Sequence, residues 1–146
     1  MTDTMTESPG AATPDFDPRV MLGVIPYVSM HGRAAEATEF YVRAFGAREI
    51  GRFADEESGE IMHVQLEING GALMMTGMCA PGEEPEKPQG FHLQLVVRDG
   101  QTWWDRATAA GCEVLMPFET MFWGDRWGLL RDPFGLQWAV NESGAR

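Results

Sequence analysis

Apolar and polar residues alternate along several stretches of the chain, with the period of two that is typical of strands that bury one face. Residues 61–68, 91–97 and 136–140 all follow this pattern. Each of these strands is therefore predicted to have one apolar face and one mostly polar face. The residues expected on the polar faces are His63, Gln65, Glu67, His92, Gln94, Gln137 and Asn141.

Two other stretches show the period of a helix. Residues 33–46 place apolar side chains three and four positions apart, which gathers them into one stripe. Residues 100–110, GQTWWDRATAA, are also predicted to be helical. Gly46 closes the first stretch and Gly111 follows the second, as glycines that end helices do. The stripe of the first helix consists of Ala37, Phe40, Tyr41, Ala44 and Phe45.

The same order of elements occurs twice, as one strand, one helix and three strands. Residues 69–71, NGG, predict a tight hairpin in the first half, and residues 132–135, DPFG, predict a turn before the last strand of the second half. Gly46 and Gly111 stand 65 residues apart, as do Gly70 and Gly135. Matched glycines within a matched order of elements indicate an internal duplication. The predicted strands are 20–30, 47–53, 61–68 and 72–76, then 91–97, 112–116, 126–131 and 136–140.

The ordered chain is expected to form one domain, residues 19–146, built from two modules. Residues 78–90, MCAPGEEPEKPQG, contain too much Pro and Gly for a helix or a central strand, so they are predicted to link the modules. The modules then cover about residues 19–77 and about residues 91–141. Residues 1–18 are rich in Thr, Pro, Gly and acidic residues, and are predicted to be disordered.

The chain resembles a known family over about residues 20–141. The segments that carry the resemblance are IPYVSMHGRAAEATEFYVRAFGA, IMHVQLEINGGALMMTG and MFWGDRWGLLRDPFGLQWAV. They are similar to the vicinal oxygen chelate superfamily, which includes glyoxalase I, extradiol dioxygenases, fosfomycin-resistance enzymes and bleomycin-resistance proteins. The last segment, with its WGDR and DPFG, looks most like the PhnB-like branch.

This resemblance implies an α+β fold. Two tandem βαβββ modules form a cupped mixed sheet, with one covering helix per module and the polar strand faces toward the hollow or toward solvent. It also implies a homodimer, because several architectures of this fold group are completed by a second copy. The fold alone does not imply a function, because it is shared by metal enzymes and by binding proteins without metal.

Metal-using members take one His, Glu or Gln ligand from each of four strands. The resemblance places these positions at Pro26, Met74, His92 and Ala139. A divalent cation needs about four to six donor atoms, mostly ionised groups or imidazoles, so this set is expected to hold no metal. A displaced site of His63, Glu67 and His92 is the alternative.

The composition limits the kinds of partner that the protein is expected to bind. The formal net charge is -11 and the sequence pI is about 4.6, which disfavours nucleic acid and favours a cationic ligand or none. Cys79 and Cys112 have neither the number nor the spacing of a disulfide framework or a thiolate metal site, which suits a reducing cytoplasm. No apolar run reaches membrane length and the N-terminus does not resemble a secretory signal, so a cytoplasmic protein without membrane contact is expected.

No catalytic residue is assigned. His92 is a candidate general base, but a pocket histidine hydrogen-bonded near Gln94 or Gln137 is the favoured alternative. Cys112 opens an apolar strand and is expected in the core. His31 is expected to serve in a loop or at the start of the first helix.

The aromatic stretch around residues 118–127 has two interpretations. Phe122 and Trp123 are expected in a long link between two strands, where they line either a small-molecule pocket or a subunit interface. Arg126 is expected either to pair with Asp125 or to meet an anionic group of a ligand. Trp138 alternates to the helix-covered face and is expected in the core. The candidate ligand-binding residues are His63, Gln65, His92, Gln94, Phe122, Trp123, Arg126, Gln137 and Asn141.

The favoured function is metal-independent binding of a small organic molecule of unknown identity, with sequestration of an antibiotic or toxic compound as one form of it. No cofactor is expected. The main alternative is a metal-dependent enzyme of the glyoxalase-lyase or dioxygenase type with a displaced metal site. A cofactor-free enzyme that uses His92, or a protein with an interaction role only, is a third reading.

Overall fold

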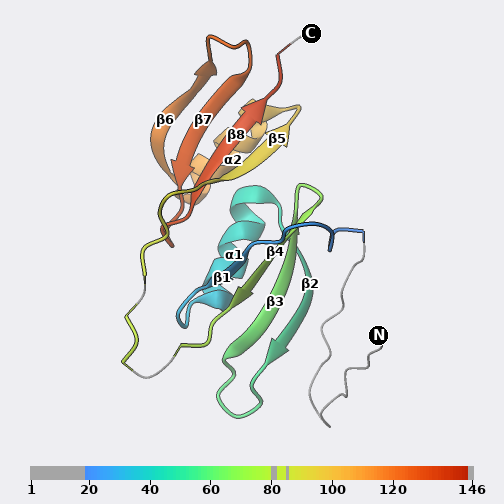
Figure 1. The fold of residues 1–146 in the computed structure, drawn as a ribbon, viewed down its shortest axis with the longest axis vertical. Coiled ribbons are helices and arrows are strands. Elements are labelled where there is room, and N and C mark those ends of the chain that lie inside the picture. Colours follow the sequence, from blue (N-terminus) through green and yellow to red (C-terminus); the bar gives the residue numbers. More distant parts are fainter. Residues whose placement is uncertain (1–18, 80–81, 85, 145–146) are drawn as a thin grey trace. The chain divides into compact units, whose positions relative to one another are not determined.

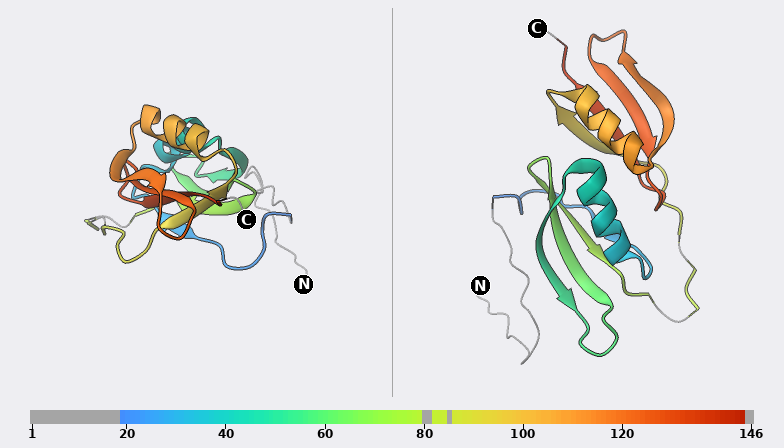
Figure 2. Two further views of the ribbon diagram at one scale, coloured as in Figure 1. Left: turned by 90° about the horizontal axis from the view of Figure 1, so that it is seen from above. Right: turned by 180° about the vertical axis from the view of Figure 1, so that it is seen from behind.

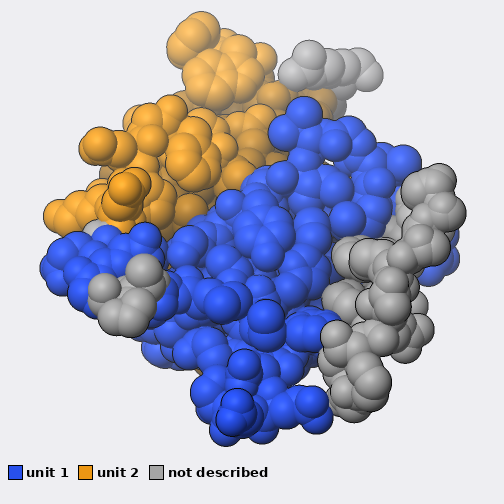
Figure 3. Space-filling view, turned by 60° about the horizontal axis from the view of Figure 1, so that its bottom comes forward, with its two compact units in different colours: residues 1–38, 48–85 blue, residues 39–47, 86–146 orange. Residues whose placement is uncertain are grey.

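The computed structural model describes residues 19–79, 82–84 and 86–144. The tail that the sequence predicts to be disordered, residues 1–18, lies outside the described residues. The chain divides into two compact units (Figure 3). The first unit contains residues 1–38 and 48–85, and the second contains residues 39–47 and 86–146.

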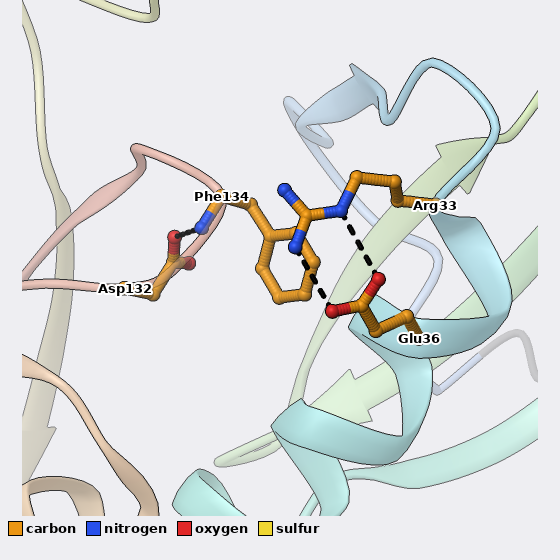
Figure 4. Close-up of polar contacts among 4 residues, drawn as sticks. All are labelled: Arg33, Glu36, Asp132 and Phe134. Atoms are coloured by element: carbon orange, nitrogen blue, oxygen red, sulfur yellow. Dashed lines mark hydrogen bonds and ion pairs between the residues drawn. The ribbon is translucent and has the colours of Figure 1, made fainter.

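The first half of the chain forms four strands and one helix. They are β1 (Tyr27–Ser29), α1 (Ala34–Phe45), β2 (Arg48–Ala54), β3 (Ile61–Ile68) and β4 (Gly71–Thr76). The sheet has the order β1–β4–β3–β2, with β1 parallel to β4 and the other pairs antiparallel (Figure 1). Asn69 and Gly70 join β3 to β4 with φ angles of 52° and 83°, as a type I′ turn requires. The predicted hairpin is thereby confirmed. Before α1, the Arg33 guanidinium donates two hydrogen bonds to the Glu36 carboxylate (Figure 4).

The second half repeats this topology. Its elements are β5 (Leu93–Val97), α2 (Gly100–Ala110), β6 (Glu113–Thr120), β7 (Arg126–Arg131) and β8 (Gln137–Glu142). The sheet has the order β5–β8–β7–β6, and only β5 and β8 are parallel. Gly46 and Gly111 follow the two helices with left-handed φ angles of 66° and 119°. The predicted α+β class, with two mixed four-stranded sheets and one helix for each in a repeated order, is confirmed.

The predicted apolar faces are largely buried in both sheets, but Gln65 of β3 and Ala139 and Asn141 of β8, on the opposite faces, are buried as well. In the first unit Val64, Leu66 and Met75 are buried on one face. In the second unit Leu130 and Val140 are buried on the corresponding face. Helix α2 covers that face of the second sheet (Figure 2), and its Trp104 lies directly over Gly128 of β7. A Cβ at position 128 would lie 2.6 Å from the Trp104 ring, so the sequence needs glycine there.

The second part of α1 packs within the second unit. The rings of Tyr41 and Phe45 lie 5.4 and 4.5 Å from the Trp138 ring of β8, and Phe40 lies edge-on to Phe134 at 5.9 Å. These contacts explain why residues 39–47 group with the second unit. Trp138 is buried, so its predicted place in the core is confirmed.

Asp132 is a buried carboxylate at the start of the DPFG turn. Its Oδ1 accepts the backbone N–H of Phe134 (Figure 4). The same oxygen accepts the backbone N–H of Leu136, and Oδ2 accepts the Tyr41 hydroxyl and the Trp138 indole N–H. Burial raises the pKa of Asp132, although each of these hydrogen bonds favours the ionised form. The first residue of the turn therefore also connects α1 to β8, through its hydrogen bonds with Tyr41 and Trp138.

Two predicted boundaries are wrong. The first strand covers only Tyr27–Ser29 rather than 20–30, because Gly23 has a left-handed φ of 71° and Pro26 has no N–H for a strand ladder. The strand predicted at 112–116 continues to Thr120, so the aromatic link before β7 is short, not long. β6 is an edge strand with irregular register between Met116 and Glu119, which accommodates Pro117.

Candidate functional site

The first polar face is the side of the β1–β4 sheet opposite its buried apolar residues. We define it by Tyr27, His63, Gln65 and Met74. The strand register sets Gln65 of β3 beside Met74 of β4, and Met74 beside Tyr27 of β1. On its other side Gln65 pairs with Gly51 of β2, which has no side chain. Two residues predicted to bind a ligand, His63 and Gln65, thus share a face of one strand.

Tyr27 and His63 form an aromatic contact on this face. The tyrosine hydroxyl and His63 Nδ1 share a hydrogen bond of 3.1 Å, and the two ring centroids lie 5.6 Å apart. Burial lowers the pKa of His63, so its imidazole is neutral at neutral pH. The pair offers two aromatic rings, inclined at 33° to each other, without a positive charge.

Gln65 is unusual among the described residues. Its side chain belongs to a residue with 0% exposure, yet neither its Oε1 nor its Nε2 has a hydrogen-bond partner. Leaving one buried polar group unpaired costs about 1–3 kcal/mol, so native proteins rarely leave both atoms of an amide unpaired. The alternation pattern predicted the face of Gln65, but only the structure reveals the state of its amide.

The second polar face belongs to the β5–β8 sheet, and we define it by His92, Gln94, Trp127 and Ala139. The register sets Ala139 of β8 beside Gln94 of β5. The Trp127 indole N–H donates to Gln94 Oε1 at 3.4 Å, and His92 Nε2 lies 3.3 Å from the same oxygen. An indole nitrogen can only donate, so this oxygen is the acceptor and His92 Nε2 acts as its second donor. The Gln94 amino group and His92 Nδ1 remain available on an exposed surface.

His92 therefore has the amide partner that the sequence favoured over a catalytic role. Trp127 was absent from the candidate residues, although its alternation with Leu129 places it on the polar side. Its ring lies 6.1 Å from the His92 ring, edge to face. The signal that could have identified it was the same period of two that identified Gln94.

Of the remaining predicted residues of the second unit, Gln137 and Asn141 lie on the same face of β8 as Ala139, whereas Arg126 lies on the opposite face. Arg126 lies on the helix-covered face, where it donates to Gln101 and stacks on the Phe118 ring at 4.3 Å. Asn141 donates to the buried Asp125 carboxylate, which also accepts the Gly144 N–H. Gln137 pairs with Arg131 across the β7–β8 ladder, and Arg131 forms an ion pair with Glu113.

Phe122 and Trp123 occupy the short link between β6 and β7. They contact each other edge to face at 4.9 Å. Phe122 is 97% exposed and Trp123 is 47% exposed, so neither is held in a pocket wall of this chain as described. The structure brings His92 together with Gln94, but it does not bring these two aromatic residues to them.

The two cysteines differ in environment. Cys79 is exposed, whereas Cys112 is buried as expected for a core residue. Burial, and secondly the nearby Asp132 carboxylate, raise the pKa of the Cys112 thiol to about 12. A thiol that stays protonated is a poor nucleophile, so this environment is that of a structural residue.

The residues at the family's metal positions do not fit a metal. Met74 and Ala139 lie on the two polar faces, and they offer a thioether and a methyl group. Tyr27, not Pro26, lies beside Met74, while Pro26 supplies only a backbone carbonyl to the Met74 N–H. Such a donor set suits no divalent cation that prefers imidazole or carboxylate.

The alternative metal site, formed by His63, Glu67 and His92, has no support within the described part of the chain either. There, no three His, Cys, Asp or Glu side chains gather closely enough to hold a metal ion. Glu67 is engaged by Arg48 in an ion pair of the β2–β3 ladder. Metal independence stays a prediction, supported by the kind of donor atoms present.

Comparison with known proteins assigns the family. A family model for the Glyoxalase/Bleomycin resistance protein/Dioxygenase superfamily matches residues 25–140. The chain is 35% identical over 131 residues to an uncharacterized protein of Mycobacterium bovis, with 83% of this chain and 86% of that protein covered.

Solved structures agree with this assignment. Protein PA1353 from Pseudomonas aeruginosa is similar with a TM-score of 0.69 and 26% identity, covering 85% of this chain and 99% of that one. TioX from Micromonospora sp. ML1 is similar with a TM-score of 0.63 and 27% identity, covering 81% and 95%. Among the described residues, neither helix is long and apolar enough to cross a membrane. The chain belongs to the Glyoxalase/Bleomycin resistance protein/Dioxygenase superfamily.

Proposed function

We propose that this protein binds a small organic molecule without a metal ion and that it is a PhnB-like member of its superfamily. The observation that carries the proposal is the pair Met74 and Ala139. Each lies in the middle of a polar face, at a position where metal-using relatives are expected to hold a donor. A face that cannot coordinate a metal ion recognises a ligand by stacking and hydrogen bonding.

The two polar faces favour a flat, neutral or cationic ligand. Tyr27 and His63 present aromatic rings on the first face, and His92 and Trp127 do so on the second. The net charge of -11 attracts cations and repels anions. Aromatic rings and negative charge together suit a cationic aromatic compound through stacking and cation–π attraction. Sequestration of such an antibiotic or toxic compound in the cytoplasm is the role that this chemistry supports best.

Elemental analysis tests the metal-independent part of this proposal. The full chain is produced in medium supplemented with Zn, Fe, Mn and Ni, then dialysed without chelator. The expected result is far less than one metal ion per chain, with no change in melting temperature on adding any of the four ions. One tightly bound ion per chain, with lyase or dioxygenase activity that depends on it, would instead establish the metal-enzyme alternative.

A thermal-shift screen tests ligand binding. Cationic glycopeptides, methylglyoxal adducts and phenolics are compared, and the expected result is stabilisation by the cationic aromatic compounds. Trp127→Leu should reduce the shift by the part that comes from stacking on the second polar face, and it should leave binding on the first polar face unchanged. Trp103→Leu is the matched control, since Trp103 lies on α2, which covers the opposite face of that sheet. Equal loss in both variants would contradict a site on the polar face. Growth protection on expression of the gene would support a resistance role.

A homodimer is the proposed assembly. Phe122 and Trp123 expose large apolar surfaces that a second copy would cover. Light scattering should give about twice the chain mass of 16.2 kDa. The double substitution Phe122→Ser with Trp123→Ser should give the mass of one chain. A monomeric wild-type protein at micromolar concentration would contradict this assembly.

A further inference from the structure

The carboxamide of Gln65 is a hydrogen-bonding group without a partner in the middle of the first polar face. The residue is 0% exposed, and both its Oε1 and its Nε2 are unpaired. Its neighbours in the sheet cannot help, because Gly51 has no side chain and Met74 offers only a weakly accepting sulfur. Nearly all buried polar groups in proteins are paired, so a completely unpaired amide calls for a partner that is not part of the chain.

The shape of a carboxamide determines that partner. It presents one acceptor and one donor side by side in a plane. Its complement is a group that presents a donor and an acceptor in the same way, which is the edge of a primary amide or of a lactam. A carboxylate offers acceptors only, so it would leave Oε1 unpaired, and the negatively charged protein would repel it.

The surroundings of Gln65 determine the rest of the ligand. Phe53 of β2 pairs with His63 and so shares the first polar face with Tyr27. Burial lowers the pKa of His63, so this imidazole offers no positive charge to an anionic ligand. Arg48, which pairs with Glu67 on this side of the sheet, is engaged by the Glu67 carboxylate. Aromatic rings beside one amide suit a flat aromatic body with a single amide edge.

We propose that Gln65 is the specificity-determining residue of this protein and that it pairs with the amide edge of a flat aromatic carboxamide or lactam. The inference rests on the proposed function, whose ligand class it narrows. Gln65 is sealed from solvent in the free protein. Entry of the ligand therefore needs a local opening, and association is expected to be slower than diffusion.

The first experiment measures the free protein. Gln65→Met keeps the volume of the side chain and removes the unpaired amide, so it should raise the urea midpoint of unfolding. Gln94→Met is the matched control, because the Gln94 oxygen already accepts from Trp127 and its loss should not raise the midpoint. Gln65→Leu repeats the test in case the methionine packs badly. A midpoint lowered in both Gln65 variants would show that the amide is satisfied in the free protein and would overturn the inference.

The second experiment measures recognition with defined probes. Oxindole and benzamide carry the amide edge, and N-methyloxindole, N,N-dimethylbenzamide and benzoate lack it. NMR titration of the full-length protein should show binding of the first two, at least tenfold weaker binding of the other three, and loss of the preference in Gln65→Met. Equal binding of both sets, unchanged binding in the variant, or no binding of oxindole and benzamide would each reject the ligand class.

Failure of this inference can be distinguished from failure of the proposed function. If the protein is free of metal and binds other compounds, but does not prefer the amide edge, only the assignment to Gln65 falls. If zinc or nickel binds stoichiometrically to the wild type and to Gln65→Met alike, the metal-independent function falls whatever the probes do.

Discussion

The hydroxyl of Tyr41 on α1 donates a 2.5 Å hydrogen bond to Oδ2 of Asp132 in the turn before β8. Both groups are buried, and the same carboxylate oxygen also accepts the Trp138 indole N–H. The bond therefore fixes the second part of α1 to the second sheet, where the Phe45 ring also packs on Trp138. Hydrogen bonds to a charged group are the stronger kind, so this contact should be measurable.

Replacing Tyr41 with Phe should destabilise the protein. The substitution keeps the ring contacts but removes one donor from a buried carboxylate, which should lower the free energy of unfolding by about 1.5–3 kcal/mol. Urea denaturation measures this difference. Tyr27→Phe is the matched control, because Tyr27 is largely exposed and its hydroxyl bonds only at the sheet surface, so its loss should cost far less. Equal losses would show that Asp132 does not depend on Tyr41.

Alkaline pH should weaken the fold through the same residue. Burial, followed by the charge and hydrogen bond of Asp132, raises the pKa of Tyr41 well above its ordinary value of 10.0. The folded chain therefore keeps this proton at a pH where the unfolded chain has lost it. The resulting stabilisation is complete below pH 10.0 and is lost as the pH rises through the raised pKa.

The measurement is the melting temperature between pH 8 and pH 12 for wild type and Tyr41→Phe. Cys112 has a raised pKa as well and titrates over part of this range, so both proteins should carry Cys112→Ala. The protein that retains Tyr41 should lose more stability at high pH than the variant. Parallel curves would mean that Tyr41 ionises without cost in the fold.

The two cysteines should react very differently. With a pKa of about 12, Cys112 has a thiolate fraction of about one part in ten thousand at pH 8, and it is buried as well. A disulfide-based thiol reagent should therefore label one thiol per native chain rapidly, and two in urea. Cys79→Ser should leave no rapidly reacting thiol. Rapid labelling of that variant would show that Cys112 is accessible.

Gly128→Ala should be poorly tolerated. The added Cβ would lie 2.6 Å from the Trp104 ring and 2.8 Å from the Phe118 backbone, so α2 or β6 would have to move. The expected loss is about 1–3 kcal/mol in the free energy of unfolding, as for overpacked cores. Gly71→Ala is the control, since its Cβ would approach no atom more closely than 3.8 Å. A neutral Gly128→Ala would mean that α2 lies further from β7.

Much of the fold was predictable from local patterns. The alternation in residues 61–68 and 136–140 identified the apolar faces, which are largely buried. It did not predict that Gln65 and Asn141, on the opposite faces, are buried too. The spacing of Gly70 and Gly135 located equivalent turns, because left-handed backbone favours glycine. The extent of β6 was not predictable, since Pro117 normally ends a strand and is tolerated here only at an edge.

The candidate site was predictable only in part. Alternation placed Gln65 and Gln94 on polar faces, but both look alike in the sequence. The Gln94 side-chain oxygen accepts a hydrogen bond from Trp127, whereas the Gln65 amide is buried without a partner. That difference depends on side chains from other strands, which no local pattern reports. Arg126 was predicted to bind a ligand or to pair with Asp125, but its side chain contacts Phe118 and Gln101. These contacts come from other segments of the chain, so the local sequence does not reveal them.

Helix α1 begins in one unit and ends in the other, since residues 34–38 group with the first and residues 39–45 with the second. Cutting the chain in the linker after residue 77 would thus separate the second sheet from Phe45, which packs on Trp138. The fragment with the second sheet would lack residues 39–47 of its own unit, so it should be insoluble when produced alone. Co-expression of the two fragments should restore a folded pair, because the packing of α1 should contribute more to the stability of the fold than the covalent linker does.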